Sequence, residues 1–122
     1  MALPQKICSL DLSNLERISR GDQSSYLKYL RQFKELIPER VDQLKKMIQD
    51  GDRKGIRHYL HKMSPQLEFF GIHEAVNLKH RLELEYNSLP QHELDSMLDQ
   101  LMSKIDQSQV EIDQVIAKTL SR

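Results

Sequence analysis

Residues Arg53–Gly71 read RKGIRHYLHKMSPQLEFFG, and this segment has an apolar side chain on every turn of a helix. Spacings of four, three, four and three residues separate these side chains, which are Ile56, Leu60, Met63, Leu67 and Phe70. They fall on one face of an α-helix, because successive residues are about 100° apart around its axis. The pattern predicts an amphipathic helix that packs on other helices, and Gly71 is a typical residue to end it.

The same periodicity extends along the chain, and no alternation of apolar and polar residues predicts a strand. A short helix is predicted around Leu12–Ile18, begun by Asp11 or by a capping box of Ser13 and Glu16. The long helices are predicted at about Gln23–Asp50, Arg53–Phe70, His73–Leu89 and Gln91–Leu120. Short loops make neighbouring helices antiparallel. We therefore expect an all-α fold, an antiparallel up-down-up-down four-helix bundle with a short N-terminal helix.

Two of the long segments contain an interruption. Pro38 lies inside Gln23–Asp50, where a proline is expected to kink the helix rather than end it. In Gln91–Leu120 the apolar stripe weakens at Ser108 and Gln109, where we expect the helix to bend or fray.

Length and charge limit the classes of function. The chain has 122 residues, so we assign residues 1–122 to a single helical domain. The 18 Lys and Arg residues balance the 18 Asp and Glu residues, which argues against a nucleic-acid-binding domain with a broadly basic surface. No segment has the roughly 20 apolar residues of a membrane span. Met1–Leu10 does not resemble a secretion signal, and Cys8 alone forms neither a disulfide framework nor a thiolate zinc site, so the expected compartment is the cytoplasm.

The five histidines are the main candidates for chemistry. His61 follows Leu60 and so lies about 100° from the apolar stripe of its helix. Its own face is polar and contains Arg57, Ser64, Pro65 and Glu68. We therefore expect the imidazole to point into solvent. An exposed imidazole is a competent nucleophile near neutral pH, and it can accept a phosphoryl group and pass it on.

A metal site is the open alternative for the histidines, since His58 and His61 are one helical turn apart. His73 and His92 each precede a glutamate, but neither has a second histidine four residues on, so the zinc-protease pattern is absent. The Glu-x-x-His signature of di-iron bundles and the glycine-rich phosphate-binding loop are absent too. We expect no resident metal and no resident cofactor.

The segment His61–Gly71, HKMSPQLEFFG, resembles the core of a histidine-containing phosphotransfer (HPt) domain. That family has its histidine on the third helix and a glycine ten residues later, at the turn into the fourth, and His61 and Gly71 have this spacing. Leu82-Glu83 matches a Leu-Glu pair that the family has in the next helix. The order of short and long helices matches as well, so the resemblance covers nearly the whole chain.

The sequence departs from the family at two positions after the histidine. The family has lysine three residues on and glycine four residues on, and this chain has Ser64 and Pro65 there. In the family the lysine steadies the phosphoryl group, and the glycine leaves room for the partner. The resemblance implies that Arg57 and Lys62 supply positive charge instead, with Ser64 as a neutral hydrogen-bond donor. The compact Pro65 is expected to leave the same room.

The resemblance implies a phosphocarrier of a two-component phosphorelay. His61 would accept a phosphoryl group from the aspartate of one response-regulator receiver domain and return it to another, with a hybrid sensor histidine kinase as a further partner. Mg²⁺ would belong to the receiver. The chain is then a phosphotransfer intermediate rather than an enzyme, and we expect a monomer that binds neither nucleic acid nor membrane. Docking is expected at Pro65, Gln66, Glu68 and Phe69, with Gly71 as a structural turn.

A second interpretation is a helical adaptor that has the HPt fold and binds a signalling partner without phosphotransfer. The serine in place of lysine at position 64 motivates it. Phe69 also has two interpretations, as a docking side chain or as a residue packed under the first helix.

Overall fold

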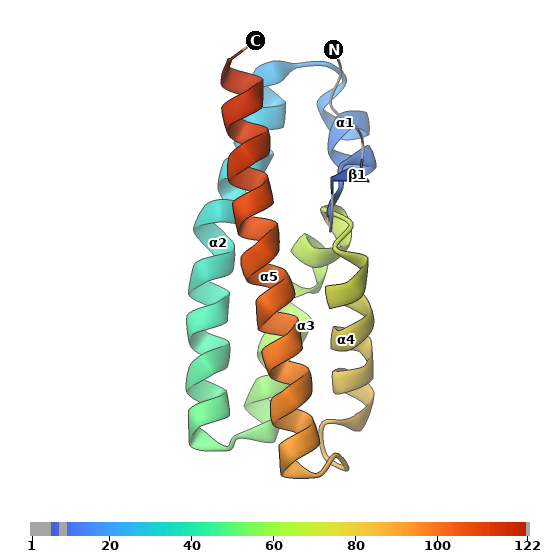
Figure 1. Cartoon of the computed structure of the whole chain (residues 1–122), viewed down its shortest axis with the longest axis vertical. Helices are drawn as coiled ribbons and strands as arrows, with labels where there is room; N and C mark the ends of the chain where they lie inside the picture. The colour runs from blue at the N-terminus through green and yellow to red at the C-terminus, as the bar shows by residue number, and fades with distance from the viewer. Residues whose placement is uncertain (1–5, 8–9, 122) are drawn as a thin grey trace.

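The computed structural model describes residues 6–7 and 10–121, and most of these are helical (Figure 1). Cys8 and most of the Met1–Leu10 segment lie outside the described residues, and so do the expectations that concern them. The described elements, in chain order, are β1 (Lys6–Ile7), β2 (Leu10–Asp11), α1 (Ser13–Ser19), α2 (Gln23–Asp50), α3 (Arg53–Phe69), α4 (His73–Glu85) and α5 (Gln91–Leu120). The predicted all-α class is confirmed.

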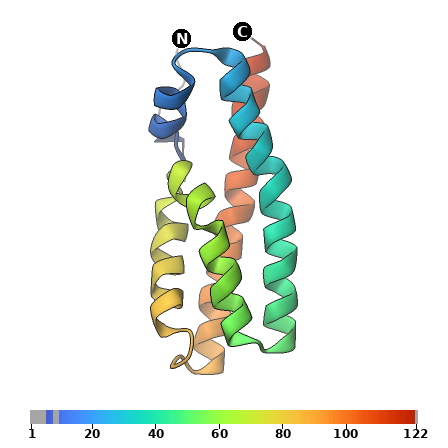
Figure 2. The same cartoon turned by 180° about the vertical axis from the view of Figure 1, so that it is seen from behind.

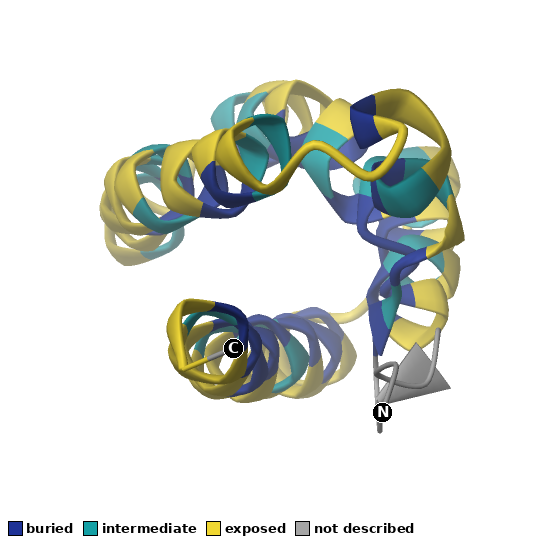
Figure 3. Ribbon diagram, turned by 90° about the horizontal axis from the view of Figure 1, so that it is seen from above, coloured by how far each residue is buried: buried dark blue, intermediate teal, exposed yellow. Residues whose placement is uncertain are grey.

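The long helices pack around one apolar core. Each contacts the next in the chain, and α2 also contacts α5, which closes the ring. Successive helices run in alternate directions in Figures 1 and 2, and the view along the bundle shows the buried residues on the inward faces (Figure 3). The most deeply buried side chains are mainly Leu and Ile from all of these helices, including Leu30, Phe33, Ile37, Leu60, Met63, Leu67, Leu82, Leu101, Ile105 and Ile112.

The observed bounds of α2 and α5 agree with the periodicity, and α3 ends one residue earlier than expected. The predicted end of the fourth helix at Leu89 is wrong, because α4 ends at Glu85. The guanidinium of Arg53 donates hydrogen bonds to the carbonyls of Tyr86 and Leu89, at 3.0 and 2.6 Å. These bonds hold the α4–α5 connection as a turn, and Pro90 disfavours a helical conformation at the residue before it.

The interruptions inside the long helices have different outcomes. The α2 helix is continuous through Pro38, so the expectation that this proline does not end the helix is confirmed, and the expected kink stays a prediction. The α5 helix is also continuous through Ser108 and Gln109, so it does not fray there, and the alternative of a bend stays a prediction. Ser108 is buried, and its hydroxyl donates to the carbonyl of Ile105 at 2.6 Å. This local hydrogen bond lets a serine occupy a core position without an unsatisfied polar group.

The N-terminal segment departs from the predicted all-helical pattern. Two short antiparallel strands pair Lys6 with Asp11 and Ile7 with Leu10. The backbone N–H of Asp11 donates to the carbonyl of Phe70 at 3.0 Å, so this segment is tied to the α3–α4 turn. The N-cap of α1 is Leu12 rather than Ser13. The carboxylate of Asp11, the other predicted cap, accepts hydrogen bonds from the N–H and the hydroxyl of Ser13 at the start of the helix.

Gly71 is the residue that makes this close approach possible. Its φ of 62° lies in the left-handed region, which glycine adopts without the usual steric cost. A Cβ at this position would overlap the Cβ of Asp11 and lie 2.8 Å from its carbonyl oxygen. The α3–α4 turn therefore requires glycine for two reasons, backbone conformation and space.

Replacing Gly71 with alanine should lower the free energy of unfolding by about 3 kcal/mol, from a strained φ and an overlap with Asp11. Gly51→Ala is the matched control, because Gly51 has a φ of 68° and no described atom lies within 4 Å of its Cβ position. That variant should lose only about 1 kcal/mol. Urea unfolding measures both values. Equal losses would show that Asp11 moves aside at no cost.

The Asp11 carboxylate gives the N-terminal segment a pH dependence. Hydrogen bonds from the Ser13 side chain, and then from its backbone N–H, hold the pKa of Asp11 below its ordinary value of 3.8. The charged form is thus bound more tightly in the folded state. The stabilisation is fully present above the unfolded pKa of about 3.9 and is lost as the pH falls through the lower folded pKa.

The stability difference between wild type and Asp11→Asn should therefore shrink as the pH falls below about 4. Chemical unfolding of both proteins in the same buffers measures it, and the other carboxylates cancel in the comparison. A difference that grows as the pH falls would contradict this account.

Candidate functional site

His61 lies in the middle of α3 and points away from the core. Leu60 and Met63, on the inward face, are completely buried, whereas the imidazole side chain is 75% exposed. The expected exposure of His61 is confirmed. Its ring nitrogens are thus accessible to a second molecule.

The ring of His61 faces a carboxylate from the next helix. Oε1 of Glu83, on α4, lies 3.4 Å from Nδ1 of His61. This oxygen is buried and accepts no hydrogen bond from any described group, although the Glu83 side chain as a whole is 17% exposed. The 3.4 Å separation is longer than an ordinary hydrogen bond, and catalytic hydrogen bonds are often long before a partner binds, so we take Nδ1–H as the donor that faces this oxygen. The lone pair then belongs to Nε2, the other ring nitrogen.

Behind Glu83 lies a buried lysine. Lys79, also on α4, is only 2% exposed. Its ammonium lies 2.6 Å from the hydroxyl oxygen of Ser64 and 3.6 Å from Oε2 of Glu83. Ser64, Lys79, Glu83 and His61 therefore form one chain of polar contacts that begins and ends on α3.

The position of Ser64 corrects its predicted placement on the exposed face of His61. The residue is 8% exposed, and its hydroxyl oxygen accepts a hydrogen bond from Lys79 of α4. The same hydroxyl donates to the carbonyl of Leu60, one turn earlier on α3, at 3.5 Å. The turn of the helix between positions 61 and 64 is enough to carry this side chain to the α3–α4 interface. Ser64 is thus a partner of Lys79 rather than a surface group beside the imidazole.

The predicted positive neighbours of His61 make cation–π contacts with aromatic rings. The Arg57 guanidinium lies 5.8 Å from the ring centre of Tyr86, and the Lys62 ammonium lies 5.3 Å from that of Tyr59. Both residues are exposed, and such contacts contribute only about 0.5–1 kcal/mol at exposed sites. They remain free to turn, so their role beside a phosphoryl group stays a prediction.

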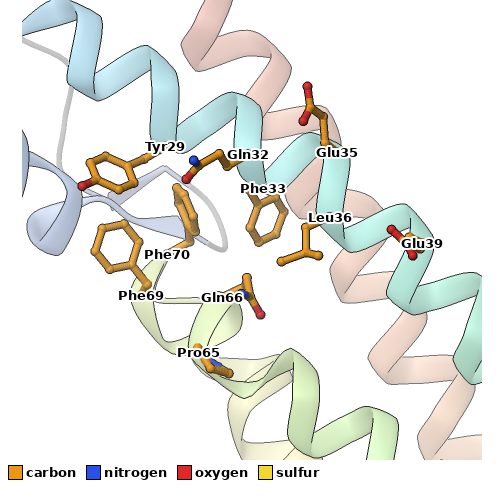
Figure 4. Close-up of a pocket in the computed structure, with 10 residues that line it drawn as sticks. All are labelled: Tyr29, Gln32, Phe33, Glu35, Leu36, Glu39, Pro65, Gln66, Phe69 and Phe70. Carbon is orange, nitrogen blue, oxygen red and sulfur yellow. The ribbon is translucent and has the colours of Figure 1, made fainter.

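A groove begins one helical turn beyond His61, between α2 and the end of α3 (Figure 4). Its volume is about 570 Å³. Pro65, Gln66, Phe69 and Phe70 line it from α3 and its C-terminal end; Tyr29, Gln32, Phe33, Glu35, Leu36 and Glu39 line it from α2. The walls are largely apolar, and Glu35 and Glu39 are exposed at the α2 side.

The predicted docking residues divide between two sides of α3. Pro65, Gln66 and Phe69 lie together in the groove, whereas Glu68 faces α4, where its carboxylate lies 3.9 Å from Nε2 of His80. Phe69 contacts both the groove and α1, and its role in docking stays a prediction. Its ring lies 5.9 Å from that of Tyr29 in the groove, and its carbonyl accepts a hydrogen bond from the Asn14 side chain of α1.

A family model for the Hpt domain matches residues 28–115, which is more than half of the chain and includes His61. The chain belongs to the Hpt domain family. Members of this family are phosphotransfer modules of two-component signalling, carriers rather than catalysts. No curated protein and no solved structure matches the chain.

Two absences concern the described part of this Hpt domain. Among residues 6–7 and 10–121, no three His, Cys, Asp or Glu side chains are grouped as ligands for a metal ion. No helix within these ranges is long and apolar enough to cross a membrane. The ring of His58, the proposed partner of His61 in a metal site, packs against Tyr59 with 5.1 Å between ring centres.

Sequence reasoning missed Lys79 and assigned no role to Glu83. The signal for Lys79 was its position: it falls four residues after Ala75 and three before Leu82, which places it on the buried stripe of α4. A lysine on an apolar stripe predicts either a bent side chain that reaches solvent or a buried partner. Glu83, four residues on, was the nearest acidic candidate.

Removing the Lys79 side chain should destabilise the Hpt domain by about 2–4 kcal/mol, because Glu83 and Ser64 both lose their partner in a buried site. Lys104→Ala is the matched control, since Lys104 pairs with Glu74 at 2.6 Å on the surface. Surface pairs contribute at most about 1 kcal/mol. The measurement is the unfolding free energy of Lys79→Ala and of Lys104→Ala, each compared with wild type. Equal losses of stability in the two variants would mean that the buried contacts of Lys79 contribute no more than the surface pair.

Proposed function

We propose that this chain is a phosphocarrier of a two-component phosphorelay, and that His61 is its phosphoacceptor. The observation that carries the proposal is the position of the exposed imidazole, with Nδ1 3.4 Å from a buried, unpartnered oxygen of Glu83. That position favours the form of the ring in which Nε2 holds the lone pair.

The chemistry follows from this form. Nε2 attacks the phosphorus of an aspartyl phosphate on a receiver domain, the phosphorus–oxygen bond breaks, and the receiver aspartate leaves as a carboxylate. The imidazole ring becomes positively charged, and the Glu83 carboxylate beside Nδ1–H stabilises that charge. Transfer to a second receiver is the reverse reaction, so one residue serves both steps. Mg²⁺ belongs to the receiver.

The groove is the proposed docking surface for the receiver. Pro65 is exposed one turn from His61, and its compact ring leaves room for the partner's approach. It also has no N–H to donate to the carbonyl of His61. Oε1 of Gln66 is buried without a hydrogen-bond partner among the described residues. With Glu35 and Glu39 at the rim, the groove fits an apolar side chain flanked by hydrogen-bond donors or basic residues.

Several finer properties belong to the same proposal. We infer that residues 1–122 form a single domain, an up-down-up-down four-helix bundle with α1 as its short N-terminal helix. The chain would act in the cytoplasm as a monomer, with response-regulator receiver domains and a hybrid sensor histidine kinase as partners. It would bind neither nucleic acid nor membrane, hold no cofactor of its own, and be regenerated by its partners rather than act as an enzyme.

An adaptor without phosphotransfer is the second candidate function. The inward-facing Ser64 favours it, because the position where the family has lysine presents no charge to the surface beside His61. The groove would then bind a signalling partner on its own.

His61→Gln should abolish labelling of the chain by a receiver domain charged with acetyl phosphate, because the nucleophile is gone. Helicity and melting temperature should stay unchanged, since the side chain is exposed. The readout is acid-labile, base-stable phosphate on the chain. His58→Gln, on the same helix and also exposed, is the control that should label normally.

Label that survives His61→Gln would overturn the assignment of His61. A folded wild type that takes no label from any receiver, yet binds one, would favour the adaptor.

A further inference from the structure

The buried ammonium of Lys79 is costly and calls for a physical reason. Moving a charged group out of water costs several kcal/mol even after the surroundings relax. Lys79 is 2% exposed, and its ammonium contacts one hydroxyl and one carboxylate oxygen. An apolar residue in its place would continue the stripe of Ala75 and Leu82. Core packing alone therefore does not explain a lysine at this position.

The Glu83 carboxylate connects this lysine to His61. Its Oε2 lies 3.6 Å from the Lys79 ammonium, and its Oε1 lies 3.4 Å from His61 Nδ1. The two oxygens thus face the two groups in a fixed order. Without the positive charge beside Oε2, burial of the carboxylate would cost free energy. The Glu83 side chain would then turn toward solvent, which it can reach.

Ser64 fixes the other end of the chain of contacts. Its hydroxyl oxygen accepts from Lys79 at 2.6 Å, which holds the ammonium against α3. Position 64 is one turn beyond His61, where the resemblance leads one to expect a lysine. In this chain a small hydroxyl at position 64 leaves space for an ammonium that comes from α4 instead.

We propose that Lys79 is a positioning residue for His61. It holds the Glu83 carboxylate in place, Glu83 accepts a hydrogen bond from Nδ1–H, and Nε2 remains the nucleophilic nitrogen. This inference rests on the proposed function of His61, and it assigns to Lys79 no direct contact with the phosphoryl group.

The first test measures which tautomer the neutral imidazole of His61 adopts. Nitrogen-15 NMR of the histidine side chains distinguishes the two neutral tautomers of His61, at a pH high enough for the ring to be neutral. In wild type we expect the Nδ1–H form to dominate. In Lys79→Met, where an apolar side chain of similar length replaces the ammonium, this preference should disappear, and the spectrum of His80, which faces Glu68, should stay the same.

The second test is rescue by exchange of the two positions. The double variant Ser64→Lys/Lys79→Ser returns an ammonium to the α3–α4 interface from the opposite helix. It should restore the Nδ1–H preference that Lys79→Met loses. If Lys79→Met does not fold, Lys79→Gln keeps a hydrogen-bond donor without the charge and is expected to lose the preference too.

The third test measures nucleophilicity without a receiver. With phosphoramidate as donor, Nε2 forms the new bond to phosphorus, the phosphorus–nitrogen bond of the donor breaks, and ammonia leaves. The labelling rate of Lys79→Met should fall by about 10-fold or more, by analogy with the loss of outer-shell partners that orient a metal-bound histidine. The double variant should recover most of the rate.

The outcomes separate this inference from the proposed function. A wild type that shows the tautomer preference but takes no label from any donor would overturn the phosphocarrier proposal and, with it, the role of Lys79. A wild type that labels on His61, with the preference and the rate unchanged in a folded Lys79→Met or Lys79→Gln, would overturn the role of Lys79 alone.

Discussion

Leu60 and Met63 are completely buried on either side of His61, and this burial determines where the imidazole points. A helix that places both side chains in the core directs the two residues between them in sequence, His61 and Lys62, outward, and His61 lies on the α4 side. The exposure of His61 is therefore a consequence of core packing rather than of any contact made by the histidine. The same helix brings Ser64 to the interface with α4 and Pro65 to the surface.

The register of α3 against α4 supplies the rest of the site. It brings Lys79 opposite Ser64, and Glu83 opposite His61. This register depends on a short turn, in which Gly71 adopts a left-handed conformation and contacts Asp11. The backbone hydrogen bond from Asp11 to Phe70 holds the turn from outside. A residue ten positions from the histidine thus controls which side chains the histidine meets.

The sequence predicts well what depends on local periodicity. The extent of α2 and α5 and the outward direction of His61 follow from apolar spacing alone. What it misses depends on contacts between distant segments. The early end of α4 involves Arg53, the strand pair at Lys6–Asp11 is tied to Phe70, and the burial of Lys79 requires Ser64 and Glu83 to lie on either side of it. A helical pattern assigns lysine to solvent unless its partners are known, and these partners lie on two helices.

The segment before residue 28 lies outside the match to the Hpt domain family, yet it reaches the groove beside His61. The side chain of Asn14 donates a hydrogen bond to the carbonyl of Phe69, a groove residue. The backbone N–H of Asp11 donates to the carbonyl of Phe70, which also lines the groove. Substitutions in this segment would therefore change the proposed docking surface without altering His61, Glu83 or Lys79. Under the proposed function, recognition and reactivity would therefore reside in separable parts of one small chain, so that the choice of signalling partner could change while the chemistry stays the same.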